Sequence, residues 1–136
     1  MPTITRFEDI EGWKKARELA RLVYLVTKTN DLAKDYALRD QMRRAAVSVM
    51  ANIAEGFGRG GNKEFIQFLG HARGSSTELK SHFYVALDAG FIAKNEFGQL
   101  YQLASETEAL ISGFMKYLQA SDVRGRKFKT TENREP

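Results

Sequence analysis

The clearest structural pattern in the chain lies in Leu38–Gly61, which reads LRDQMRRAAVSVMANIAEGFGRGG. Its apolar residues recur at the three- and four-residue spacing of a helix and form two stripes. A surface helix normally buries one apolar face, so two stripes predict either a central position in the fold or packing against a neighbouring subunit. The first stripe is Leu38, Met42, Ala45, Val49 and Ile53, and the second is Val47, Met50, Ala54 and Phe57.

The same periodicity appears in three further segments of the chain. It predicts helices over residues 12–28, 35–55, 63–89 and 95–119, with Asn62 as the N-cap of the third. The four glycines Gly56, Gly58, Gly60 and Gly61 are expected to end the second helix, because glycine weakens a helix and supplies the positive φ of a C-terminal cap. The two prolines, Pro2 and Pro136, leave the interior free for long helices.

These helices predict an all-α fold. Four helices joined by short loops pack most simply as an antiparallel up-and-down four-helix bundle, since strand-like alternation is absent from the sequence. We assign the bundle to residues 1–120 as a single domain. From residue 121 the sequence turns polar and charged, which predicts a flexible basic C-terminal tail over residues 121–136.

Composition narrows the setting of the protein. The 136 residues contain no cysteine, which excludes disulfides and thiolate chemistry and fits a reducing cytoplasm. Neither a signal peptide nor a membrane span is expected. The chain has 21 lysines and arginines against 17 acidic residues, a net charge of +4 that is compatible with binding a polyanion.

The run from Gln41 to Arg59 resembles the signature of one family. It is similar to the four-helix bundle proteins first named from open reading frames in intervening sequences of bacterial 23S ribosomal RNA genes. Blocks at Lys63–Phe65, Phe68–Leu69 and Ala72–Leu79 extend the resemblance, which covers about residues 7–118. Met50 stands where the family usually has proline, so the residue on which a helix kink would depend is absent.

The resemblance implies a left-handed bundle that assembles as a homopentameric ring and lacks enzymatic activity. A related group assists the reverse transcriptases of diversity-generating retroelements and binds nucleic acid. The resemblance therefore suggests nucleic acid or a reverse transcriptase as a partner of this chain.

Polar residues form a stripe on each of the two central helices. Arg44, Ser48, Asn52 and Glu55 share one face of the second helix, and His71, Ser75, Glu78 and His82 share one face of the third. If these stripes face each other, Arg44 or Asn52 pairs with Glu78 in a buried network that fixes helix register. Binding of a ligand between the stripes is the alternative.

The glycine loop Gly56–Gly61 formally satisfies the dinucleotide fingerprint G-x-G-x-x-G. That fingerprint requires a strand before the loop, whereas a helix is predicted there. A plain turn is expected, with a phosphate site at the start of the third helix, beside Arg59 and Lys63, as the alternative.

The sequence contains few residues that could form a metal site or a catalytic site. The bundle lacks the Glu-x-x-His pairs of di-iron proteins, and Glu78 and His82 are too few ligands for a metal. Serine and histidine candidates share one helix, where a catalytic triad seldom assembles. We therefore expect no metal, no cofactor and no catalytic residues.

Basic residues give the strongest functional indication. Lys14, Arg17, Arg21 and Lys28 share one face of the first helix, with Lys15 adjacent, although such a face often serves only solubility. A ring of subunits would repeat this face and create a multivalent phosphate-binding surface. We predict binding of structured RNA or DNA through Lys14, Lys15, Arg17, Arg21, Lys28, Arg59, Lys63, Arg124, Arg126, Lys127 and Lys129.

Tyr24, Tyr36 and Phe128 are candidates for stacking on unpaired bases within this prediction, although packing is expected for the first two. The alternative function is a protein–protein adaptor, for example an accessory subunit of a retroelement reverse transcriptase.

Overall fold

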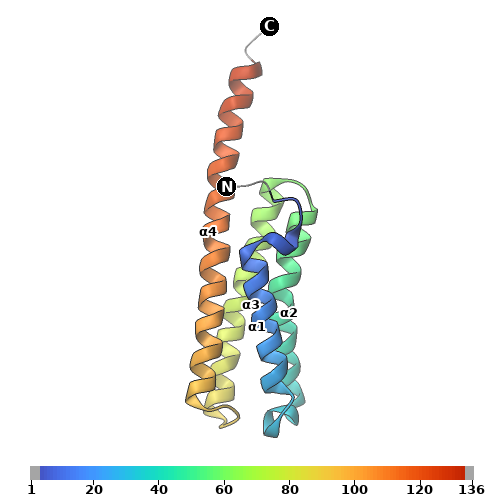
Figure 1. The fold of residues 1–136 in the computed structure, drawn as a ribbon, viewed down its shortest axis with the longest axis vertical. Coiled ribbons are helices and arrows are strands. Elements are labelled where there is room, and N and C mark those ends of the chain that lie inside the picture. The colour runs from blue at the N-terminus through green and yellow to red at the C-terminus, as the bar shows by residue number, and fades with distance from the viewer. Residues whose placement is uncertain (1–3, 134–136) are drawn as a thin grey trace.

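The computed structural model describes residues 4–133, and the side chains of all of these except Asn30 and residues 122–133. This part of the chain is all-helical and contains no strand. Each of its four long helices runs antiparallel to the next and packs against two others, as a bundle requires (Figure 1). They are α1 (Glu11–Thr27), α2 (Tyr36–Gly58), α3 (Asn62–Asp88) and α4 (Lys94–Asn133), with short 3-10 helices η1 (Phe7–Asp9) and η2 (Asn30–Ala33) before α1 and α2.

Side chains and glycines set the helix starts. The Asp35 carboxylate accepts a hydrogen bond from the backbone N–H of Leu38 at 3.0 Å and caps α2. Glu96 reaches back to the N–H of Ala93 at 2.9 Å at the start of α4. The predicted cap Asn62 is instead the first residue of α3, with Gly61 in the cap position. Gly60 turns the chain at a φ of 85°, so the helix begins one residue earlier than expected.

The end of α2 also differs from the prediction, because the helix continues through Gly56 to Gly58. Of the four glycines in this stretch, Gly60 alone has the positive φ expected of a glycine that ends a helix. Gly56 is buried within α2, where a Cβ atom would lie 2.6 Å from Cβ of Phe68. It permits close packing of α2 on α3 and does not terminate the helix.

Apolar side chains fill the bundle in two clusters along its axis. One surrounds Leu19, Met42 and Phe83, and the other surrounds Val49, Phe65 and Ile111. All five residues of the first α2 stripe are buried. Burial of this stripe is the main contribution of α2 to the core.

The second stripe of α2 is only partly covered. Met50 packs against both clusters and Phe57 against one, but Val47 keeps 42% of its surface exposed. A central position of α2 in the fold is therefore wrong, since α2 is one of four outer helices. Packing of Val47 against another subunit stays a prediction.

Helix α4 continues to Asn133, where a helix end near residue 119 and a flexible tail were predicted. Its last turns extend beyond the ends of the other three helices (Figure 1). No proline lies between Ser121 and Asn133, and adding a residue to an existing helix costs far less than nucleating a new one. Polar composition alone therefore does not mark the end of α4.

Candidate nucleic-acid interface

The basic residues of α1 divide between two sides of the helix. Lys14, Arg17, Arg21 and Lys28 are exposed on the predicted face, and Lys14 pairs with Glu11 at 3.1 Å. Lys15 lies on the opposite side and bridges to Glu106 of α4 at 3.4 Å. Among the described residues, neither Arg21 nor Lys28 forms an ion pair. The structure therefore removes Lys15 from the predicted stripe and leaves the other four together.

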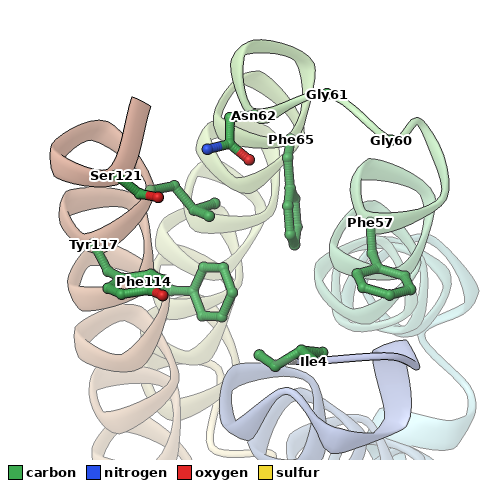
Figure 2. A pocket seen from close by; sticks show the side chains of 10 residues that line it. Ile4, Phe57, Gly60, Gly61, Asn62, Phe65, Phe114, Tyr117 and Ser121 are labelled. Carbon is green, nitrogen blue, oxygen red and sulfur yellow. The ribbon is translucent and has the colours of Figure 1, made fainter. Parts of the chain in front are cut away.

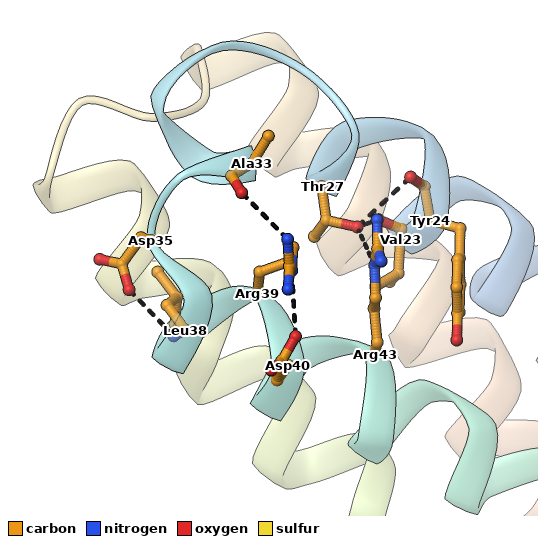
Figure 3. Close-up of polar contacts among 9 residues, drawn as sticks. All are labelled: Val23, Tyr24, Thr27, Ala33, Asp35, Leu38, Arg39, Asp40 and Arg43. Carbon is orange, nitrogen blue, oxygen red and sulfur yellow. Dashed lines mark hydrogen bonds and ion pairs between the residues drawn. The ribbon is translucent and has the colours of Figure 1, made fainter.

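Two arginines of α2 extend this surface beside the C-terminal half of α1. Arg43 donates from Nε to the Thr27 hydroxyl at 2.8 Å, and its guanidinium lies 4.6 Å from the centre of the Tyr24 ring. The buried Thr27 hydroxyl in turn donates to the carbonyl of Val23 at 2.7 Å. Figure 3 shows Arg43 held between Thr27 and Tyr24, which fixes a cation against α1.

Arg39, one turn before Arg43, is held in the same manner (Figure 3). Its Nη1 donates to the carbonyl of Ala33 at 3.1 Å, and its Nε pairs with Asp40 at 3.0 Å. The guanidinium lies 4.7 Å from the centre of the Tyr36 ring, which is 64% exposed. We call the surface formed by Arg17, Arg21 and Tyr24 of α1, Lys28 at the C-cap of α1, and Tyr36, Arg39 and Arg43 of α2 the α1–α2 face.

Sequence reasoning missed Arg39 and Arg43 as parts of this face. Their spacing of four places both on one side of α2, which is a signal that sequence alone contains. The pairing of Arg39 with Tyr36 is likewise local, three residues apart on α2, whereas the pairing of Arg43 with Tyr24 depends on how α1 lies against α2, which local pattern does not give. Asp31, Asp35 and Asp40 reduce the positive charge nearby, although Asp35 caps α2 and Asp40 is paired with Arg39.

The start of α3 resembles a turn more than a phosphate site. Arg59 pairs with Glu55 at 3.0 Å and covers the Phe68 ring at 5.1 Å, while Lys63 is exposed. Helices flank the glycine loop on both sides, as predicted, so the context of the dinucleotide fingerprint is missing.

The glycine loop borders a cavity of about 430 Å³ at this end of the bundle (Figure 2). Its walls combine polar and apolar groups, and Asn62, Ser121 and the Tyr117 hydroxyl are the polar side-chain groups among its lining residues. The apolar side chains are Ile4, Phe57, Phe65, Phe114 and Leu118. No charged side chain lines the space, so it suits neither a phosphate nor a metal ion.

The two polar stripes meet at serines. The Ser48 and Ser75 hydroxyls lie 2.9 Å apart, and the Asn52 amide donates to the Ser48 carbonyl at 2.8 Å and hydroxyl at 3.0 Å. The expected pairing of Arg44 or Asn52 with Glu78 does not form. Glu78 is 58% exposed and pairs with His82 on its own helix at 3.0 Å, because it points to solvent and not toward α2.

The remaining predicted features fall outside these contacts. Arg44 and Glu55 are exposed, and Glu55 contacts Arg59 and not the serines. The side chains of Arg124, Arg126, Lys127 and Lys129, and of Phe128, lie outside those described. Across the described residues, no cluster of three or more His, Cys, Asp or Glu side chains could hold a metal, and no helix is long and apolar enough to span a membrane.

Comparison with known proteins identifies the family. The model of the 23S rRNA-intervening sequence protein family matches residues 8–113. The chain belongs to this family. A crystal structure of a protein of unknown function from the S23 ribosomal protein family of Bacteroides thetaiotaomicron has the same fold, with a TM-score of 0.71 and 22% identity. The match covers 77% of this chain and 95% of that one. No curated protein matches the sequence.

The match to the 23S rRNA-intervening sequence protein family includes part of the candidate interface. The matched region contains the whole α1–α2 face and the glycine loop but ends before the extension of α4. The predicted contribution of the basic residues from Arg124 to Lys129 therefore rests on their sequence alone.

Proposed function

We propose that the protein is a cytoplasmic, non-catalytic nucleic-acid-binding bundle that works as a homopentameric ring. The α1–α2 face supports the proposal, because it gathers Arg17, Arg21, Lys28, Arg39 and Arg43 from two helices onto one surface. Arginine and lysine side chains bind phosphates with little dependence on sequence and release counterions from the nucleic acid. Structured RNA or DNA is the expected ligand.

Charge reversal on α1 tests this proposal. The double variant Arg17→Glu/Arg21→Glu should weaken binding of a fluorescein-labelled structured RNA more than tenfold at about 50 mM salt, since two phosphate contacts become repulsive. Fluorescence anisotropy measures the affinity. Raising the salt to about 200 mM should weaken wild-type binding steeply.

Lys94→Glu/Lys116→Glu on α4 is the matched control, because both lysines are exposed and the net charge changes equally. Its affinity should fall less than threefold. Absence of wild-type binding at low salt, or an equal loss in the α4 control, would count against nucleic-acid binding through the α1–α2 face.

A protein–protein adaptor is the second candidate. Exposed apolar side chains favour it, among them Val47 on α2 at 42% and Val85 on α3 at 50% exposure. A partner such as a reverse transcriptase would cover them. Under this alternative, the α1 charge reversal leaves partner binding intact, and substitution of the valines removes it.

A further inference from the structure

The α1–α2 face contains two tyrosine rings that differ in their surroundings from the other tyrosines. Tyr84, Tyr101 and Tyr117 each pack against another aromatic ring. Among the described side chains, Tyr24 and Tyr36 pair with no aromatic ring, and each instead contacts one guanidinium. Tyr24 is 40% exposed and Tyr36 is 64% exposed. Their rings are therefore available to a planar partner from solvent.

The guanidinium beside each ring is fixed before any ligand arrives. Arg43 is hydrogen-bonded to Thr27, a fully buried residue, and Arg39 is hydrogen-bonded to the Ala33 carbonyl at the end of η2. Each arginine therefore stays against its ring, and little side-chain entropy is lost when the opposite ring face is covered. Tyr36 is 64% exposed, so most of its side chain is accessible to solvent although Arg39 lies against its ring.

The same arginines keep donors free for a backbone phosphate. The described hydrogen bonds of Arg43 use Nε, and those of Arg39 use Nε and Nη1, so both retain terminal N–H groups. Lys28 is exposed on the same side of α1 as Tyr24. A ring for a base thus lies next to a cation for its phosphate, which is the arrangement that binds single strands.

We propose that Tyr24 and Tyr36 are stacking platforms for unpaired bases, so that the α1–α2 face binds single-stranded segments in preference to continuous duplex. This inference rests on the proposed nucleic-acid binding and specifies its ligand. Bases within a duplex are already stacked on one another and cannot cover a protein ring. Loops and ends of a structured RNA, or single-stranded DNA, offer free base faces.

The test compares a labelled single-stranded oligonucleotide of about 20 nucleotides with a duplex of the same length, by fluorescence anisotropy at low salt. Tyr24→Ala/Tyr36→Ala should lose about tenfold or more in single-strand affinity and less than twofold in duplex affinity, because stacking on an aromatic ring contributes only to the former. Circular dichroism and thermal melting confirm that each variant is folded.

Three variants control for effects other than stacking. Tyr24→Phe/Tyr36→Phe keeps both rings and should bind single strands like wild type, and Tyr36→Trp should bind at least as tightly. Tyr84→Ala removes a tyrosine of similar exposure, 49%, from a different surface and should change neither affinity.

The outcomes separate the two proposals. Wild-type binding of both ligands with no loss in the alanine double variant, or with an equal loss on both, overturns the stacking proposal and leaves nucleic-acid binding standing. Failure of the wild type to bind either ligand overturns both.

Discussion

Gly56 shows how a single residue sets the distance between two helices. A Cβ atom there would lie 2.6 Å from Cβ of Phe68 and 3.0 Å from Cδ1 of Phe65. The Cβ atom of Phe68 is fixed by the backbone of α3, and the Phe65 ring is buried in the core, so Gly56→Ala should lower the free energy of unfolding by about 1–3 kcal/mol. Thermal melting followed by circular dichroism should show a loss of several degrees.

Gly58→Ala is the matched control for this substitution. A Cβ atom at Gly58 meets nothing within 4 Å, and its φ is not positive. The free energy of unfolding of the Gly58→Ala variant should stay constant or rise by up to about 1 kcal/mol, because alanine restricts the unfolded chain. Equal melting temperatures for the two variants would show that the close approach at Gly56 is not required.

At the scale of elements, the serine contact between α2 and α3 replaces the network predicted around Glu78. Ser75→Ala removes the hydroxyl that faces Ser48, and we expect it to lower the free energy of unfolding by about 0.5–1.5 kcal/mol. Glu78→Gln should leave stability unchanged, since the Glu78 side chain is 58% exposed. Urea denaturation measures both. A larger effect of Glu78→Gln than of Ser75→Ala would restore the predicted network.

Elements were predictable where a local pattern specifies them. The apolar spacing predicted all four helices, and their starts lie within one residue of the predictions, since periodicity and capping depend on neighbours in sequence. The ends of α2 and α4 were not predicted. Gly56 is helical and packs closely against α3, and α4 continues through a polar segment that contains no proline.

The candidate site was less predictable than the helices for the same reason. Basic residues on α1 share a face by spacing alone, whereas Arg43 joins them through Thr27 and Tyr24, which lie 16 and 19 positions earlier in the sequence. Lys15 was misplaced because adjacency in sequence puts neighbouring side chains on different sides of a helix. Contacts between helices decide which charges form one surface.

For the whole molecule, unequal helix lengths explain where the bundle is hollow. α1 has 17 residues and α3 has 27, a difference of about 15 Å in length at about 1.5 Å per residue. Residues before α1 cover part of the remaining space. Ile4 and Phe114 line both the cavity of about 430 Å³ beside the glycine loop and a second one of about 400 Å³ between α1 and α4. At the opposite end, the buried Leu32 of η2 covers the core beside Arg39 and Arg43, and an open depression of about 610 Å³ lies between α1 and the first turns of α4.

The proposed assembly of several bundles should depend on Val47 of α2, and we expect substitution of this residue to disrupt it. Val47→Asp would bury an unpaired carboxylate at the subunit contact, which costs more than a typical interface residue contributes. Light scattering of the purified variant should therefore give the mass of a single chain in place of a pentamer. Helix content should stay unchanged, since Val47 is 42% exposed within one bundle.

The proposed assembly would also determine how tightly a long nucleic acid is held. In the proposed pentamer, five copies of the α1–α2 face would bind one strand with a multivalent gain of about 10²–10⁴, so Val47→Asp should weaken binding of a long RNA far more than binding of a short one. Val85→Asp, at 50% exposure on α3, is the control and should change neither mass nor affinity. If Val47→Asp keeps the wild-type mass, the second stripe of α2 is not the subunit contact. If light scattering of the wild type gives the mass of a single chain, the proposed pentamer does not form. One bundle must then supply the whole affinity from a single α1–α2 face.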